Sequence, residues 1–212
     1  MRRRWVISLL AAALAVQGEI IDRTVATVGT SVVTVSDVQL HLRILAFLDH
    51  QPADLSMSEQ RKAVDRLVEQ ALIRREVELS RYTPPDMADV DTMVERLRKS
   101  PLEDDAVFQR ELAIYGITDD QIRQALLWQL TLLRFIEYRF RPGVQVSDAE
   151  VNAYYQQEVK AKAGDRTPPA LDDVRDDIEK VLTSRRVDEA LNHWLEQARA
   201  QVAIRIHEED FR

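Results

Sequence analysis

Residues 20–48 read IIDRTVATVGTSVVTVSDVQLHLRILAFL, and this stretch decides the fold. β-Branched residues stand on both sides of residues 29–31, a Gly-Thr-Ser sequence that favours a turn, so two short strands are predicted. Ser36 and Gln39 then form a capping-box pattern, which marks the start of a helix. The stretch therefore predicts a β-hairpin that leads directly into the first helix.

The rest of the chain is dominated by apolar residues at helical spacing, which predict a mainly helical protein. The capping-box pattern recurs at Ser56, Thr118 and Ser147, each followed three residues later by Glu or Gln. The predicted helices cover residues 37–49, 57–81, 87–99, 105–115, 119–140 and 171–201, and Ser147 opens one more. Leu79 is included in the apolar stripe of the second helix.

The last element closes the fold. Residues 202–206 alternate like a half-buried strand, and the N-terminal hairpin is the other strand candidate, so both chain ends should meet in one small sheet. Residues 161–169 (AKAGDRTPP) predict a linker. The expected organisation is a signal peptide (1–18), a helical domain (19–160), a linker (161–170), a C-terminal helix and strand that pack back on the same domain (171–206), and a tail (207–212).

The N-terminus has the layout of a secretory signal peptide. Three arginines from Arg2 to Arg4 precede an apolar run over residues 5–16, and Gly18 is a plausible cleavage position. A retained anchor is the alternative, although the run is shorter than the roughly 20 apolar residues that span a bilayer. No later segment is apolar enough to cross a membrane. We therefore expect an exported protein with no integral membrane segment after cleavage.

Charge and residue usage exclude several classes of function. The chain has 29 Lys and Arg against 36 Asp and Glu, a net charge of −7, and no purely basic cluster, which argues against nucleic-acid binding. Without cysteine it has no disulfide, thiolate nucleophile or cysteine-based zinc site. Its five glycines form no phosphate-binding loop, and its four histidines form no HExxH pair. His41 and His193 lie in predicted amphipathic helices, where we expect them to be hydrogen-bonded or exposed. We predict no catalytic residue, metal or cofactor.

Aromatic, aliphatic and thioether side chains on the predicted helices suit a peptide-binding surface, because they accept varied apolar segments. The candidate binding residues are Leu45, Phe47, Met57, Met93, Phe108, Trp128, Phe135 and Tyr138. For each of them the alternative is packing in a hydrophobic core, since apolar stripes at helical spacing usually face a core.

Five segments together resemble the SurA and parvulin-type family of periplasmic chaperones. They are residues 20–48, 63–78 (AVDRLVEQALIRREVE), 108–117 (FQRELAIYGI), 146–155 (VSDAEVNAYY) and 174–206, the last like the family's C-terminal helix and strand. The opening match includes Asp22-Arg23, the valine-rich strands and Ser36-Asp37. The resemblance implies a multi-helix body like the SurA N-terminal domain, with a small sheet formed by the hairpin and the C-terminal strand.

One departure from the family pattern bears on activity. In relatives an isomerase (parvulin) domain of roughly 90 residues separates the two halves, whereas here a short linker joins Tyr155 to Leu171. The resemblance therefore implies an ATP-independent periplasmic holdase that binds unfolded outer-membrane or exported polypeptides in an apolar crevice. Two alternatives stay open: a dedicated protein–protein interaction subunit of the cell envelope and a degenerate prolyl isomerase. A homodimer formed by swapping the C-terminal helix and strand is a further expectation.

Overall fold

The N-terminal hairpin and the C-terminal strand form one small antiparallel sheet. The strands are β1 (Thr24–Val28), β2 (Ser31–Thr34) and β3 (Ile204–Ile206). β1 lies in the centre, where Ala26 pairs with Val33 of β2 on one side and with Ile206 of β3 on the other. The predicted contact between the two chain ends is therefore confirmed. β3 pairs here with β1 of its own chain, and the swapped dimer stays a prediction.

Helices make up most of the remainder, and the mainly helical fold class is confirmed. The structure is a computed structural model that describes residues 22–99, 105–164 and 166–207. The helices are α1 (Val35–Leu48), α2 (Met57–Leu79), α3 (Met87–Lys99), α4 (Asp105–Tyr115), α5 (Asp119–Phe140), α6 (Asp148–Tyr154), α7 (Ala161–Ala163) and α8 (Leu171–Gln201), with a 3-10 turn η1 (Arg141–Gly143) and a π-helix η2 (Tyr155–Lys160). The predicted signal peptide (1–18) and tail residues 208–212 lie outside the described residues.

The helix starts follow the capping-box prediction in part. Thr118 caps α5 and Ser147 caps α6, and each accepts a hydrogen bond from the backbone N–H three residues along. At α1 the prediction is wrong by two residues. Thr34, rather than Ser36, accepts the hydrogen bond from the Asp37 N–H, and the Asp37 carboxylate accepts one from the Thr34 N–H. An ionised carboxylate is the stronger acceptor at this position. α2 begins without a side-chain cap.

The largest hydrophobic cluster joins both ends of the chain. It lies between the sheet and helices α1, α2, α5 and α8, and it includes Val25 of β1, Phe135 of α5 and Leu195 of α8. Phe135 is fully buried there. Leu79, predicted to extend the apolar stripe of α2, is 69% exposed, because it stands in the last turn of the helix and outside this cluster.

Two further clusters divide the rest of the molecule. The second surrounds Phe108 and Leu112 between α1, α3, α4 and α5. The third contains Val151, Tyr155 and Ile178, from α6, η2 and the first half of α8. We call residues 144–186 the arm and the remaining described residues the body.

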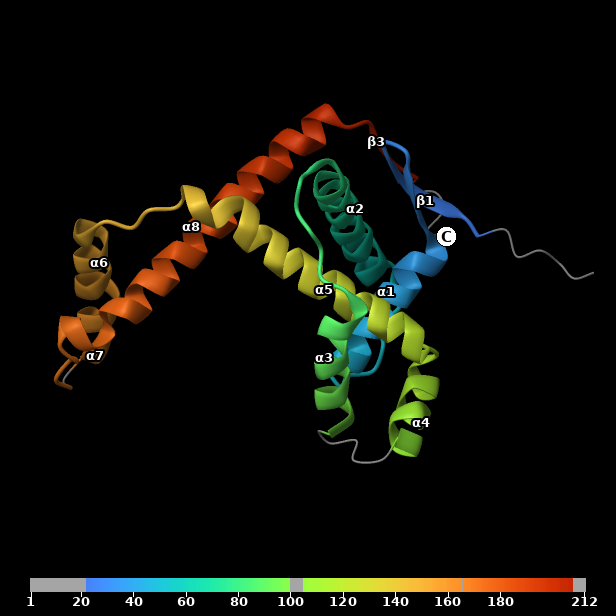
Figure 1. Cartoon of the computed structure of the whole chain (residues 1–212), viewed down its shortest axis with the longest axis horizontal. Helices are drawn as coiled ribbons and strands as arrows, with labels where there is room; N and C mark the ends of the chain where they lie inside the picture. Colours follow the sequence, from blue (N-terminus) through green and yellow to red (C-terminus); the bar gives the residue numbers. More distant parts are fainter. Residues whose placement is uncertain (1–21, 100–104, 165, 208–212) are drawn as a thin grey trace, which may run out of the picture.

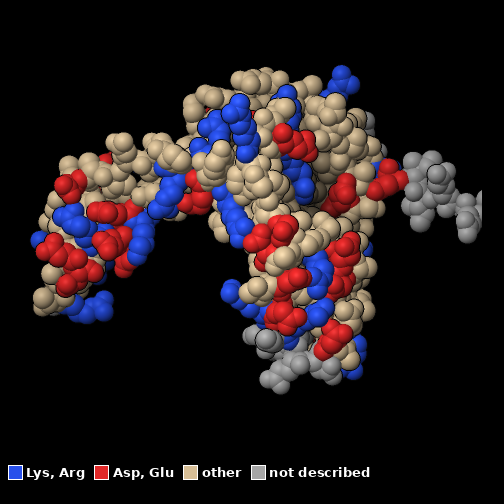
Figure 2. All heavy atoms as spheres, viewed as in Figure 1, with Lys and Arg blue, Asp and Glu red and all other residues tan. Residues whose placement is uncertain are grey.

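The long helix α8 connects the arm to the body. Figure 1 shows it running from the region of α7, at the far left, toward β3 at the edge of the sheet. Figure 2 shows a hollow between the arm and the body, with acidic and basic side chains mixed over this face. The first residues of the predicted linker are helical, because the helix opened by Ser147 continues through η2 to the end of α7. The predicted domain boundaries stay a prediction.

Candidate functional site

An open groove runs between α1, α2 and α5 and is bordered by β2. Its volume is about 940 Å³, at the upper end of the range for ligand sites. All three helices supply apolar side chains to it, among them Leu40, Leu45, Leu67, Val77, Leu127 and Leu132. The groove therefore offers apolar surface on every wall.

The helical walls of the groove are long enough to lie along a short extended polypeptide. The lining residues that helices supply fall within 37–48 on α1, 67–78 on α2 and 120–132 on α5, and β2, Asp49 and Pro84 complete the lining. At 1.5 Å per residue each of these helical walls is about 17 Å long. An extended polypeptide rises about 3.3 Å per residue, so about five residues of a client strand fit along the groove.

Three of the four glutamines in the lining add free hydrogen-bonding groups to the apolar walls, since the side chain of the fourth, Gln121, accepts a hydrogen bond from the Thr118 N–H. Gln70 lies on α2, and Gln124 and Gln129 lie on α5. Within the described chain none of them has a side-chain hydrogen bond. A primary amide both donates and accepts, so these side chains match the peptide groups of any sequence.

Arg74 of α2 reaches across the groove to Trp128 of α5. Its guanidinium carbon lies 3.8 Å from the centroid of the indole ring, within cation–π distance. Arg74 is exposed by surface area. The groove walls nevertheless exclude part of the water around its guanidinium, and this desolvation lowers the pKa of Arg74. The negative charge of Glu78, one turn along α2, opposes the change by a smaller amount. No described carboxylate lies within ion-pair distance of Arg74. The groove therefore contains a cation whose N–H donors are free for a ligand.

Two buried polar atoms in groove-lining residues also lack a partner. Nε2 of His41 and Nε1 of Trp128 have no hydrogen bond to any described residue. Burial lowers the pKa of His41, and the charge of Arg66 lowers it further. The expectation that His41 is hydrogen-bonded or exposed is wrong, because it is half-buried and Nε2 is unpartnered. His193 is hydrogen-bonded to Gln197 at 2.9 Å, as expected. Buried polar atoms in folded proteins usually have a hydrogen-bond partner, so these two atoms are unusual.

The structure brings two of the predicted binding residues into the groove: Leu45 from α1 and Trp128 from α5. Phe47, Phe108 and Phe135 are buried in the body instead. The rings of Phe47 and Phe108 meet edge to face, with centroids 6.1 Å apart. These three phenylalanines fill the core, so the core-packing alternative describes them and the groove does not contain them.

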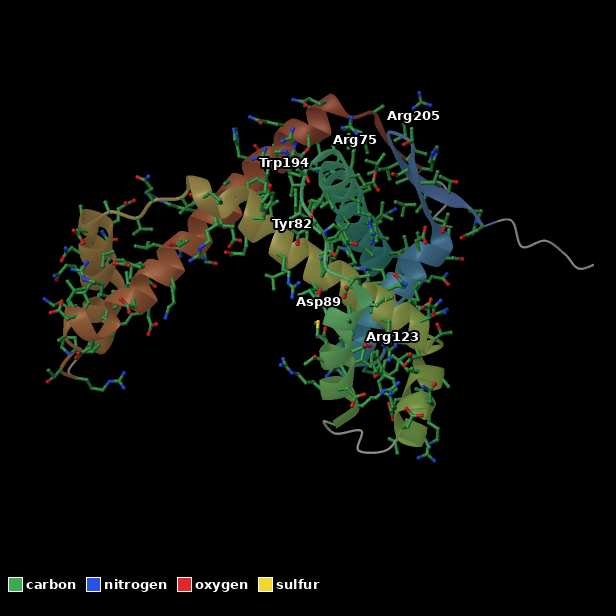
Figure 3. All side chains as sticks on the ribbon, in the orientation of Figure 1. Arg75, Tyr82, Asp89, Arg123, Trp194 and Arg205 are labelled. Carbon is green, nitrogen blue, oxygen red and sulfur yellow. The ribbon has the colours of Figure 1, made fainter. Side chains whose placement is uncertain are left out.

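The other three predicted residues also lie outside the groove. Met57 is 45% exposed at the start of α2, and Met93 is half-buried against the second cluster. Tyr138 is 52% exposed on α5 and contacts Tyr82, with ring centroids 5.2 Å apart. Tyr82 follows α2 in the sequence and is labelled in Figure 3. Among the described residues the groove lining contains no methionine, so the apolar part of its surface is aliphatic and aromatic.

Sequence reasoning missed Arg74, although the sequence carries a signal for it. Leu67, Ala71 and Arg74 follow one another at helical spacing, and all three line the groove. Charged residues normally lie on the helix face opposite the apolar stripe. An arginine within the stripe therefore indicates a face that solvent still reaches. The glutamines carry no comparable signal, because an amide on a predicted helix is typical of any exposed surface.

The described residues carry no sign of metal chemistry or of a membrane-spanning helix. Residues 22–99, 105–164 and 166–207 contain no group of three or more His, Asp or Glu placed to hold a metal ion. In the same ranges no helix is long and apolar enough to cross a membrane. The described groove lining offers apolar contact, amide hydrogen-bonding groups and, in Arg74, a cation with no described ion-pair partner.

The fold is that of a mainly helical protein whose two ends close one small sheet beside an open apolar groove. No protein-family model matches the chain. The chain is 27% identical over 187 residues to the protein named Chaperone SurA of Chromobacterium violaceum, and the alignment covers 86% of this chain and 42% of that protein. The two proteins are therefore distantly homologous, and this chain spans less than half the length of that curated relative.

Proposed function

We propose that this protein is an ATP-independent periplasmic chaperone that holds unfolded exported polypeptides, outer-membrane proteins among them, in the groove between α1, α2 and α5. The groove carries the proposal, because it is open, apolar on all three walls and long enough for about five extended residues. The distant homology to Chaperone SurA supports the same class of function. The sequence has no phosphate-binding loop, so the proposed cycle of binding and release uses no nucleotide.

Burial of apolar client side chains supplies the affinity. Each large side chain that is fully buried contributes roughly 1.5–3 kcal/mol. Association offsets part of this gain through lost freedom and ordering, so a few anchors give weak binding and ready release. Amides from Gln70, Gln124 and Gln129 satisfy client peptide groups without selecting a sequence. The net charge of −7 helps to keep the loaded complex soluble.

We further propose that the protein lacks prolyl isomerase activity. The connection that would hold an isomerase domain in the relatives is the short segment between Tyr155 and Leu171. Tyr155 is buried in the arm, and its hydroxyl donates a hydrogen bond of 2.6 Å to the carbonyl of Pro169. This hydrogen bond holds the two ends of the segment between Tyr155 and Leu171 together. It supports a binding function without an inserted catalytic domain.

Aggregation of a denatured outer-membrane protein, followed by light scattering after dilution into nucleotide-free buffer, tests the proposal. We expect the purified protein to suppress scattering at near-stoichiometric ratios. Leu45→Ser removes an apolar groove residue that belongs to none of the three core clusters. It should weaken client binding about tenfold without unfolding the protein. The matched control is Leu133→Ser, because Leu133 is 62% exposed on α5 and does not line the groove.

Other results would favour the alternatives. Equal suppression by Leu45→Ser and the wild type would place client binding outside the groove. No suppression of any client, together with co-purification of one stoichiometric partner, would favour a dedicated interaction subunit of the cell envelope. Catalysis in a standard proline-limited peptide assay would favour a degenerate isomerase.

A further inference from the structure

We propose that the groove selects client segments that carry one side-chain carboxylate among apolar residues, and that Arg74, stacked on Trp128, binds that carboxylate. This inference rests on the proposed function and names the feature of the client that the site reads. A guanidinium presents a planar fork of N–H donors that fits a carboxylate through two parallel hydrogen bonds. Stacking on the indole ring at 3.8 Å holds the fork in place before a client arrives.

A comparison with Arg98 shows what is unusual about Arg74. Arg98 also lies over an aromatic ring, with its guanidinium carbon 5.2 Å from the centroid of Phe108. Its guanidinium nitrogens lie 3.1 Å from Asp119 and 3.6 Å from Asp105. The protein thus supplies carboxylates to Arg98, whereas no described carboxylate pairs with Arg74. Arg74 is therefore open to a carboxylate supplied by a client.

The position of Arg74 along the groove favours a side-chain carboxylate over a chain terminus. The α2 wall extends over residues 67–78, so Arg74 stands within it and apolar lining continues on both sides, from Leu67 to Val77. A client strand that runs along the groove therefore passes Arg74 with residues before and after the contact. A terminal carboxylate at this point would leave part of the groove empty.

The charges around the groove favour a single carboxylate over a polyanion. The lining also includes Asp37, Asp49, Glu78 and Asp120. These four acids repel a run of negative charges, while Arg74 attracts one charge at a fixed point. The expected segment is therefore apolar with an isolated Asp or Glu, and neither an acidic stretch nor a nucleic acid matches it.

Calorimetric titration of the purified protein with matched peptides tests the assignment. Each peptide has about eight residues with apolar flanks, blocked ends and Glu, Gln or Lys at the central position. We expect the Glu peptide to bind about fivefold more tightly than the Gln peptide, the difference between a charge-assisted and a neutral hydrogen bond. The Lys peptide should bind more weakly than either. The preference for Glu should shrink as salt is raised.

Two variants separate Arg74 from its neighbourhood. Arg74→Gln should abolish the preference for Glu while the Gln peptide still binds. Arg75→Gln is the matched control, because Arg75 is the next residue of α2 but lines a separate small pocket beside Trp194 (Figure 3). It should keep the full preference. Unchanged melting of both variants would show that the fold is intact.

The outcomes distinguish this inference from the proposed function. Binding of all three peptides with equal affinity would overturn the role of Arg74 and leave the groove as a general apolar site. A preference for Glu that survives in Arg74→Gln would also overturn it. A gain as large from a free C-terminal carboxylate on the Gln peptide would assign the site to chain ends. If no peptide binds, the proposed function itself fails.

Discussion

The body and the arm differ in how their cores are assembled. In the body, the first cluster joins Val25 near the start of the described chain to Leu195 near its end. In the arm, the core is Val151, Tyr155 and Ile178, which are close in sequence and come from three neighbouring elements. The arm adds ion pairs on its surface, such as that between Arg175 and Asp148 at 2.7 Å, and exposed pairs of this kind contribute little.

This difference places the groove in the more stable region of the molecule and the easier opening motions in the arm. All three walls of the groove belong to the body. Because its core joins distant parts of the chain, the body should unfold as one cooperative unit. The arm has few buried side chains and should open at lower free energy while the groove keeps its shape. A preformed groove avoids the part of the binding cost that would come from ordering its own walls. The predictions below test this contrast, from the largest expected effect to the smallest.

Phe135→Ala should have the largest effect. Phe135 is fully buried in the first cluster, where its ring lies 5.4 Å from that of Tyr82. Removing the ring should cost about 3–5 kcal/mol of the free energy of unfolding. Urea denaturation followed by circular dichroism measures it. A loss under about 1 kcal/mol would show that the body packs less tightly than the buried surface indicates.

Val151→Ala should act on the arm alone. Val151 is 1% exposed in the third cluster, and its truncation should cost about 2 kcal/mol of local stability. Hydrogen exchange of α6 and the first half of α8 should accelerate, while exchange of α2 stays as in the wild type. Client binding in the groove should be unchanged. Faster exchange throughout α2 would contradict the independence of the two regions.

His41 should make the stability of the body depend on pH. Burial, and then the charge of Arg66, lowers the pKa of His41 in the folded state. The unfolded chain therefore takes up a proton more readily, and the free energy of unfolding falls as the pH drops below about 6.5. His41→Gln should lose less melting temperature than the wild type between about pH 7.5 and pH 5. His193→Gln, at the exposed hydrogen-bonded histidine, is the control and should behave like the wild type.

Most of the fold could be predicted because its determinants are local. Apolar spacing placed the helices, and the sheet followed because one hairpin and one terminal strand had to find partners. The end of α4 is local as well, since Gly116 follows the helix with φ of 64° and the Ile117 N–H donates a hydrogen bond to the Leu112 carbonyl, as in a left-handed helix cap. The start of α1 was misplaced, since Thr34 and Ser36 both have a suitable residue three positions on, and pattern alone does not rank Asp37 above Gln39.

The site was less predictable because helical periodicity does not tell which apolar face another helix covers. Trp128 and Phe135 lie two turns apart on one face of α5. Trp128 nevertheless lines the groove and Phe135 is sealed in the core, because neighbouring elements cover only part of that face. Arg74 is defined by a contact between two helices, with Trp128 as its partner. Such a contact depends on how α2 and α5 cross, which spacing within either helix does not reveal.

Capping threonine and serine residues give the smallest effect and the most direct comparison of the two regions. Thr34 caps α1 in the body and Ser147 caps α6 in the arm, each in a capping box. Replacing either by Ala should cost about 1 kcal/mol. Thr34→Ala should lower the global unfolding midpoint in urea, since α1 packs in the cooperative body. Ser147→Ala should leave that midpoint in place and accelerate hydrogen exchange only within the arm. Ser36→Ala, at the position predicted from the sequence to be the cap, should change neither, and a global loss of about 1 kcal/mol there would restore Ser36 as the cap.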